Sequence, residues 1–115
     1  MDEIKKLTEK INKFRDDRNW RQYHKPKELA ISVCIEAAEL LEKFQWERKN
    51  TPEYITSHKQ EIGEELADVM IYLLLLANEL GLDVKKVVEE KLAHNDKKYP
   101  VEKFKGSDKK YNTHD

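Results

Sequence analysis

This chain of 115 residues contains few residues that break helices or cross-link chains: three glycines, three prolines and a single cysteine. A single cysteine excludes an internal disulfide. Cys34 lies in an apolar stretch with no basic residue within a helical turn, so it is predicted to be a small core residue and not a nucleophile. The scarcity of glycine and proline, together with 39% charged residues, favours long helices with solvated faces over a β-sandwich, which needs many turns.

The sequence also lacks a long apolar segment and an excess of one charge. Its longest strongly apolar run, 69–77, is far shorter than the roughly 20 residues that span a bilayer, and the first residues form no apolar stretch of signal-peptide length. The net charge of −1 provides no general attraction to nucleic acid or to an anionic membrane. We therefore expect a soluble, cytoplasmic protein that binds neither. A weaker alternative, nucleic-acid binding, depends on basic residues between which acids intervene: Lys97, Lys98, Lys103, Lys105, Lys109 and Lys110.

Apolar residues recur at helical spacing along most of the chain, which predicts an all-α, four-helix-bundle-like fold. Thr51 and Asp83 are predicted N-caps, and Gly81 is predicted to follow the end of a helix. We expect a single domain over residues 1–100 and an irregular tail over 101–115. The expected helices cover 3–18, 26–48, 52–80 and 84–98, with a loop at 19–26.

The third expected helix is apolar on nearly every side from Leu66 to Ala77. One bundle of this size can cover only part of such a surface. The mismatch predicts a homodimer or a dimer of dimers.

Four carboxylates stand in otherwise apolar helical segments, as the pairs Glu36 and Glu39 and Glu65 and Asp68. Residues three apart share a helix face, and antiparallel packing of the second and third helices would let both pairs converge. A buried carboxylate must be paired, protonated or bound to a metal. Neither of the two apolar segments in which the pairs stand contains an Arg or Lys that could pair with them. The pattern predicts binding of one or more divalent cations, against the alternative that these are ordinary exposed acids. The two faces comprise Ser32, Glu36, Glu39 and Lys43, and Glu61, Glu65, Asp68 and Tyr72.

Oxygen ligands alone suit hard cations, Mg²⁺ in particular. A di-iron bundle would need Glu-x-x-His motifs, whereas the third residue after Glu36 is Glu39 and after Glu65 is Asp68. Zinc prefers clustered histidine or cysteine ligands. The histidines are scattered along the chain: His24, His58, His94 and His114.

The two acid pairs and several neighbouring segments resemble the all-α nucleoside triphosphate pyrophosphohydrolases of MazG type, in particular their single-domain dCTP pyrophosphatase branch. The family motif is Glu-x-x-Glu, a spacer, then Glu-x-x-Asp, and here 25 residues separate the two halves. The resemblance covers about residues 4–112. Its further segments are Asn19-Trp20-Arg21-Gln22-Tyr23-His24, Glu39-Leu40-Leu41-Glu42-Lys43-Phe44-Gln45-Trp46, Glu64-Glu65-Leu66-Ala67-Asp68-Val69-Met70-Ile71-Tyr72-Leu73 and Lys97-Lys98-Tyr99-Pro100.

The resemblance implies an oligomeric helical bundle that binds Mg²⁺ through the four acids and cleaves a nucleoside triphosphate into the monophosphate and pyrophosphate. The expected role is removal of unwanted triphosphates, with dCTP or a modified dCTP among the candidate substrates. A carboxylate that takes a proton from the attacking water completes the chemistry. Glu39 is the first candidate for this base, and Glu36, Glu42 and Glu64 stay open as alternatives.

The resemblance also implies which residues bind substrate. Trp20 and Trp46 would stack on the base, and Tyr72, Lys91 and Asn95 would approach the phosphates or sugar. Further candidates are His24, Lys98 and Tyr99. Each residue has a simpler interpretation: Trp20 as a cap on the core, Trp46 as a dimer contact, Lys91 and Lys98 as solvated charges, and His24 as a loop residue with a local hydrogen bond.

One position departs from the family pattern. Animal dCTP-specific enzymes have a histidine nine residues before the first tryptophan, where this chain has Ile11, which cannot hydrogen-bond to a base. Cytosine preference is therefore not implied, although the reaction type is. The competing hypothesis is a catalytically silent module that senses nucleotide or dimerises through its helices, and the intact set of four acids weighs against it.

Overall fold

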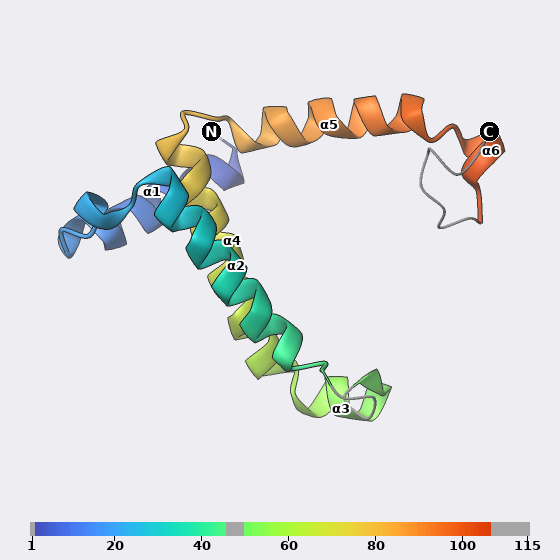
Figure 1. Ribbon diagram of the computed structural model, residues 1–115, viewed down its shortest axis with the longest axis horizontal. Helices are drawn as coiled ribbons and strands as arrows, with labels where there is room; N and C mark the ends of the chain where they lie inside the picture. The colour runs from blue at the N-terminus through green and yellow to red at the C-terminus, as the bar shows by residue number, and fades with distance from the viewer. Residues whose placement is uncertain (1, 46–49, 107–115) are drawn as a thin grey trace. The chain divides into compact units, whose positions relative to one another are not determined.

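The computed structural model describes residues 2–45 and 50–106, and over these residues it contains helices and no strand, which confirms the all-α class (Figure 1). The chain divides into two units, one ending at Leu82 and one beginning at Asp83, and each is described by itself. The expected division into a domain over 1–100 and a tail stays a prediction. No helix among the described residues has the length and apolar character needed to span a membrane.

The first unit contains most of the described helices, and two of them, α1 and α3, begin at a capping side chain. The Asp2 side chain accepts a hydrogen bond from the backbone N–H of Lys5 at 2.7 Å and caps the first helix. Thr51 caps α3 in the same way, through the N–H of Tyr54 at 3.2 Å, as predicted. The elements are α1 (Glu3–Asp17), a short 3₁₀ turn η1 (Arg21–Tyr23), α2 (Pro26–Glu42), α3 (Pro52–Ser57) and α4 (Lys59–Glu79).

The second predicted helix is shorter than expected, because α2 ends at Glu42 rather than near residue 48. The N–H groups of Lys43 and Phe44 donate to the carbonyls three residues earlier, those of Leu40 and Leu41. Such bonds tighten the last turn of a helix and end its α-helical ladder. Residues 46–49 lie outside the described part of the chain.

The third predicted helix is two helices, α3 and α4, with the break at His58. The side chains near the break compete for backbone acceptors: the Ser57 hydroxyl donates to the carbonyls of Glu53 and Tyr54, and His58 Nδ1 lies 2.9 Å from the Tyr54 carbonyl oxygen. The His58 ring also stacks on Tyr54, at a centroid distance of 4.1 Å. Local side-chain bonds of this kind interrupt a helix. The expectation of one continuous helix was therefore wrong.

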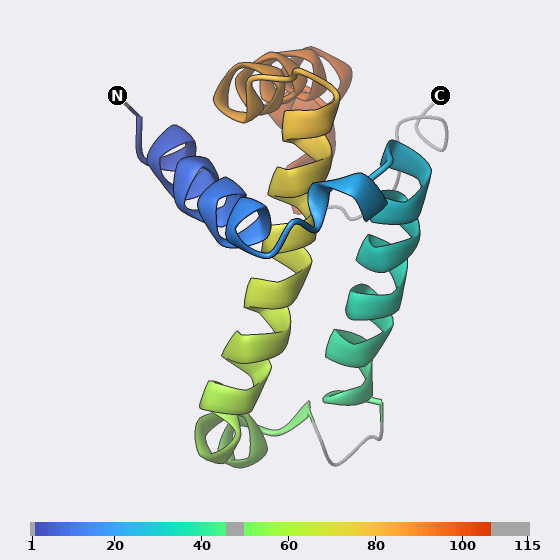
Figure 2. The same cartoon turned by 90° about the vertical axis from the view of Figure 1, so that its left-hand side faces the viewer.

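Helices α2 and α4 are packed against each other and run in opposite directions, while α1 crosses the C-terminal half of α4 (Figure 2). Their buried apolar side chains are few: Ile11, Leu29, Leu74 and Leu75. Cys34 is exposed, so its prediction as a core residue was wrong. The reason is that one partner helix covers only one side of α2, and the residues flanking Cys34 on the uncovered side, Ile31 and Ile35, are about half exposed.

The second unit begins with α5 (Val84–Lys98), whose bounds match the prediction. Asp83 caps it through the N–H of Lys86 at 3.2 Å, and Gly81 at the end of the first unit adopts a positive φ of 67° after α4, both as predicted. Within the expected tail, the described residues include a short helix, α6 (Val101–Phe104), which follows Pro100. Phe104 is buried and packs edge-on against Tyr99 at 4.9 Å, which provides the local apolar contact that orders this turn. Residues 107–115 lie outside the described part.

Candidate metal centre and adjoining pocket

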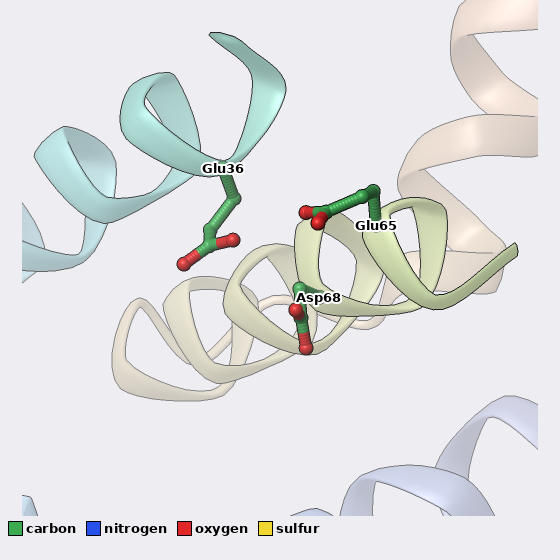
Figure 3. A group of neighbouring side chains, drawn as sticks. All are labelled: Glu36, Glu65 and Asp68. Carbon is green, nitrogen blue, oxygen red and sulfur yellow. The ribbon is translucent and has the colours of Figure 1, made fainter. Parts of the chain in front are cut away.

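Three of the four predicted acids meet between α2 and α4. One carboxylate oxygen each from Glu36, Glu65 and Asp68 lies within 4.8 Å of the others. Figure 3 shows Glu36 reaching from α2 toward Glu65 and Asp68, which project from neighbouring turns of α4. The antiparallel packing of the two helices thus brings together acids that lie far apart in the sequence.

The cluster is electrostatically unfavourable when all its members are ionised. Partial burial raises the pKa of Glu36, and the neighbouring carboxyls of Glu39, Asp68 and Glu65 raise it further. Burial also raises the pKa of Glu65, to which Glu39 adds and which the nearby Lys43 ammonium opposes. Oε2 of Glu36 and Oε2 of Glu65 are buried, and neither has a hydrogen-bond partner among the described residues.

These features test whether a divalent cation suits the cluster. Buried carboxylate oxygens without partners cost free energy unless a proton or a cation satisfies them. Hard cations such as Mg²⁺ prefer a few carboxylate oxygens and fill their remaining positions with water or phosphate. The donor set of Glu36, Glu65 and Asp68, all oxygen and all on facing helices, fits such an ion.

Glu39, the fourth predicted acid, also lies near this centre. Its half-buried side chain influences the pKa of both Glu36 and Glu65, so it lies close to each, but it is not among the three acids whose oxygens fall within 4.8 Å. The nearby cation, Lys43, is 3.9 Å from Glu61 across the two helices. Lys43 therefore offsets part of the negative charge without occupying the centre.

A cavity of about 190 Å³ adjoins the acid cluster and shares Asp68 with it. Three of the predicted substrate-binding residues, Trp20, His24 and Tyr72, line it. The volume is below the range of pockets that enclose a drug-sized ligand, and so suits one part of a nucleotide rather than the whole. The complete lining is Ile11, Phe14, Arg15, Trp20, His24, Asp68, Ile71, Tyr72 and Leu75.

The aromatic wall of the cavity is held together by local contacts. Trp20 packs edge-on against Phe14, with ring centroids 5.7 Å apart, and the Arg18 guanidinium lies 3.8 Å over the Phe14 ring. Arg18 also donates to the Phe14 carbonyl at 3.0 Å. Trp20 is 44% exposed, so part of the indole is open to solvent and available for contact.

Arg15 lines the cavity although the sequence reasoning did not select it. It is only 3% exposed, and its guanidinium is ion-paired with Asp16 at 2.9 Å and with Glu79 at 3.3 Å. A signal was present, because Arg15 follows the buried Ile11 by four residues and so occupies the apolar register of its helix. A charge in that register indicates a buried, partnered side chain.

Five predicted substrate-binding residues are not part of the described first unit. Trp46 is outside the described residues. Lys91, Asn95, Lys98 and Tyr99 belong to the second unit, where Lys91 and Asn95 border a shallow apolar hollow on α5 and the Lys98 ammonium lies 5.8 Å from the Tyr99 ring centroid. Their role at the site stays a prediction.

The first unit is all-α, and its facing antiparallel helices present carboxylates beside an aromatic-lined cavity. The fold and the site therefore define a helical protein with a candidate divalent-cation centre. Comparison with known proteins gives the family: residues 31–113 match the MazG-like family, and the chain belongs to it.

Similar proteins carry pyrophosphatase names. The chain is 35% identical over 91 residues to dCTP pyrophosphatase 1 of Mus musculus and 34% identical over 90 residues to that of Homo sapiens, covering 76% of this chain in each case. It spans about half the length of these relatives, 54% and 53%. A crystal structure of a pyrophosphatase from Archaeoglobus fulgidus superimposes with a TM-score of 0.79 at 40% identity, covering 87% of this chain and 94% of the other.

Proposed function

We propose that this chain is a Mg²⁺-dependent nucleoside triphosphate pyrophosphohydrolase, which cleaves a ribo- or deoxyribonucleoside triphosphate into the monophosphate and pyrophosphate. The observation that carries the proposal is the position of Asp68, which belongs both to the acid cluster and to the lining of the adjoining cavity. A ligand with a nucleoside in the cavity would extend its phosphates toward the carboxylates. The pyrophosphatases to which the chain is similar support the same reaction class.

Glu36, Glu65 and Asp68 would hold Mg²⁺, with Glu39 as a further candidate ligand. When bound, the ion would neutralise the charge of the phosphates and the charge that develops on the leaving pyrophosphate. Glu39 is also the first candidate for the general base, because it lies beside the cluster rather than among its three closest oxygens. It would take a proton from water as the water oxygen bonds to the α-phosphorus, and the bond from that phosphorus to the bridging oxygen of pyrophosphate breaks.

The cavity would receive the nucleoside. Trp20 offers an indole face for stacking, and Tyr72 lies one helical turn from Asp68, so it can contact the sugar or the α-phosphate. Trp46, Lys91, Asn95, Lys98 and Tyr99 stay proposed substrate contacts on the basis of the family resemblance alone.

The proposal includes a homodimer or a dimer of dimers. Apolar side chains at helical spacing on α4 are substantially exposed in the single chain: Leu66 at 55%, Met70 at 45% and Leu73 at 40%. Together with Ile31 and Ile35 on α2, they exceed the scattered apolar exposure that is normal for a monomer. A second copy of the chain would cover them.

The test is pyrophosphate release from dCTP and from the other common triphosphates, with Mg²⁺ and with EDTA. We expect Mg²⁺-dependent turnover that Glu39→Gln lowers by at least about a hundredfold, the scale of a lost general base, without loss of helical circular dichroism. Glu28→Gln, which removes an exposed acid from the same helix, is the matched control and should retain activity. Nucleotide binding without turnover would favour the silent sensing module. Full activity in Glu39→Gln would mean that Glu39 is not the general base and would leave Glu36, Glu42 or Glu64 for that role.

A further inference from the structure

The last residue of α4, Glu79, connects two arginines from other parts of the first unit to that helix. Its Oε1 accepts hydrogen bonds from Nη1 of Arg15, on α1, at 3.3 Å and from Nε of Arg21, at the start of η1, at 3.0 Å. The Glu79 side chain is 16% exposed and that of Arg15 is 3% exposed, so water competes little for this half of the contact. Arg21, at 61% exposed, forms the outer half. We call these two contacts the Glu79 bridge.

Glu79 lies on the face of α4 that borders the cavity. It follows Asp68 by eleven residues and Tyr72 by seven, and residues at these spacings share one helix face. Asp68 and Tyr72 line the cavity, and Glu79 lies beyond them on the same face. Burial lowers the pKa of His24, which also lines the cavity; the Arg15 charge lowers it further, and the Glu79 charge opposes this decrease. The Glu79 bridge is therefore close to the cavity without being part of the acid cluster.

The two arginines of the bridge are attached to the backbone on either side of Trp20, whose indole lines the cavity. The Trp20 N–H donates to the carbonyl of Arg15 at 3.1 Å, and Arg21 follows Trp20 directly in the chain. The Arg21 carbonyl in turn accepts a hydrogen bond from the N–H of His24 at 2.9 Å. Among the residues that the structure describes, the contact between Arg21 and Glu79 is the one hydrogen bond that joins the connection 19–25 to α4.

We propose that Glu79 is a positioning residue, which through Arg15 and Arg21 holds Trp20 at the distance from α4 that a stacked nucleobase requires. This inference rests on the proposed function, in which Trp20 contacts the base. The edge-on packing of Trp20 on Phe14 orients the indole relative to α1 but does not attach it to α4. The cavity has walls from both the connection and α4, so its width depends on a contact that spans the two. Glu79 acts through Trp20 and not by contact with substrate.

The test measures kcat and KM for Glu79→Gln and for Arg21→Met, with Mg²⁺ and the triphosphate that the wild-type chain turns over best. We expect Glu79→Gln to raise KM about tenfold, within the range for a lost base–aromatic stacking contact. Arg21→Met breaks only the exposed half of the bridge and should raise KM about threefold, the scale of an exposed ion pair. In both variants kcat should change by less than about twofold, because the acid cluster is unaltered.

The two substitutions change the charge in opposite directions. Glu79→Gln removes a negative charge and Arg21→Met removes a positive one, so a general electrostatic effect on an anionic triphosphate would lower KM in the first and raise it in the second. Loss of the contact that they share would raise KM in both. Lys13→Met is the matched control, because it removes a cation whose ion pair with Asp17, at 2.8 Å, is exposed and lies within α1. It should leave KM unchanged.

Replacement of Trp20 determines whether Glu79 acts through it. In a Trp20→Ala background, Glu79→Gln should raise KM no further, because the side chain that it positions is absent. A merely structural role of Glu79 would instead multiply the two effects. Arg21→Met in the same background keeps the inference testable should Glu79→Gln fail to fold, since Arg21 is exposed and Arg15 keeps both acidic partners in that variant.

The outcomes separate this inference from the proposed function. With an active wild-type chain, the inference is refuted and the proposed function stands in any of three cases: KM stays at its wild-type value or falls in Glu79→Gln, Trp20→Ala leaves KM unchanged, or the effects multiply in the double variants. If the wild-type chain hydrolyses no triphosphate, the proposed function fails and the inference fails with it.

Discussion

Asp68→Asn is expected to make the metal-free protein more stable while removing its response to Mg²⁺. The substitution keeps the size of the side chain and deletes one negative charge from a cluster whose oxygens lie within 4.8 Å of one another. Two unit charges at that distance repel by roughly 0.9 kcal/mol in water and roughly 3.5 kcal/mol at an effective dielectric constant of 20. Asp68 is exposed, so the lower end applies, and we expect a gain of about 1 kcal/mol from the loss of repulsion with Glu36.

For a chain of this size, a gain of about 1 kcal/mol raises Tm by about 4 °C. Added Mg²⁺ should stabilise the wild-type protein much more than the variant. At a hundredfold excess over its Kd, an ion that binds only the folded state adds about 2.7 kcal/mol, which would raise the wild-type Tm by on the order of 10 °C. Asp68→Asn, with a ligand removed, should show little of this rise and no turnover.

The assay is thermal unfolding followed by circular dichroism at one protein concentration, in EDTA and in Mg²⁺, at low and at high salt. Screening should shrink the gain of the metal-free variant as salt increases. Glu28→Gln, the exposed acid on α2, is the control and should change Tm little under any condition. A metal-free Asp68→Asn that melts at or below the wild-type Tm at low salt, or that keeps the full Mg²⁺ response, would refute the reasoning from a repulsive metal-binding cluster.

Three further predictions concern the pH dependence of the site and the binding of substrate. The pKa values of Glu36 and Glu65 are raised in the folded protein, so their ionisation disfavours folding; metal-free stability should therefore rise as pH falls from neutral toward the ordinary glutamate value of 4.5, and Glu36→Gln should reduce this rise. The same proton uptake competes with cations, so the apparent Mg²⁺ affinity measured by titration should decrease over that range, and a pH-independent affinity would contradict the assigned ligands. Trp46→Ala should mainly raise KM for triphosphate, because a stacking contact contributes to binding more than to the chemical step; steady-state kinetics with unchanged KM would make Trp46 structural.

Features that depend on neighbours along the chain were predictable. The bounds of α5 match the expected helix, and Thr51, Gly81 and Asp83 occupy the predicted ends of helices. Capping bonds and positive φ values involve residues only a few positions apart, so their chemistry is legible in the sequence. The break at His58 was missed because it depends on how the Ser57 and His58 side chains are oriented toward the Tyr54 carbonyl.

The candidate site was likewise predictable only in part. The spacing of Glu36 and Glu39 and of Glu65 and Asp68 placed each pair on one helix face, and the resemblance to a family added the expected reaction. That oxygens of Glu36, Glu65 and Asp68 come within 4.8 Å of one another, and that Arg15 lines the cavity, depends on how α1, α2 and α4 cross. Crossing angles and offsets arise from packing between distant residues, for which spacing along one helix contains no information.

The sequence by itself determined the helical class, the capping residues and the presence of two acid pairs, because periodicity and capping are properties of short stretches of chain. The tertiary structure alone decided which oxygens approach within 4.8 Å, which of them are buried without a partner, and which charged side chains border the adjoining cavity. The physical reason is that burial and charge proximity arise where α1, α2 and α4 pack together. They set the pKa of Glu36 and Glu65 and the environment of Arg15, and no single helix defines them.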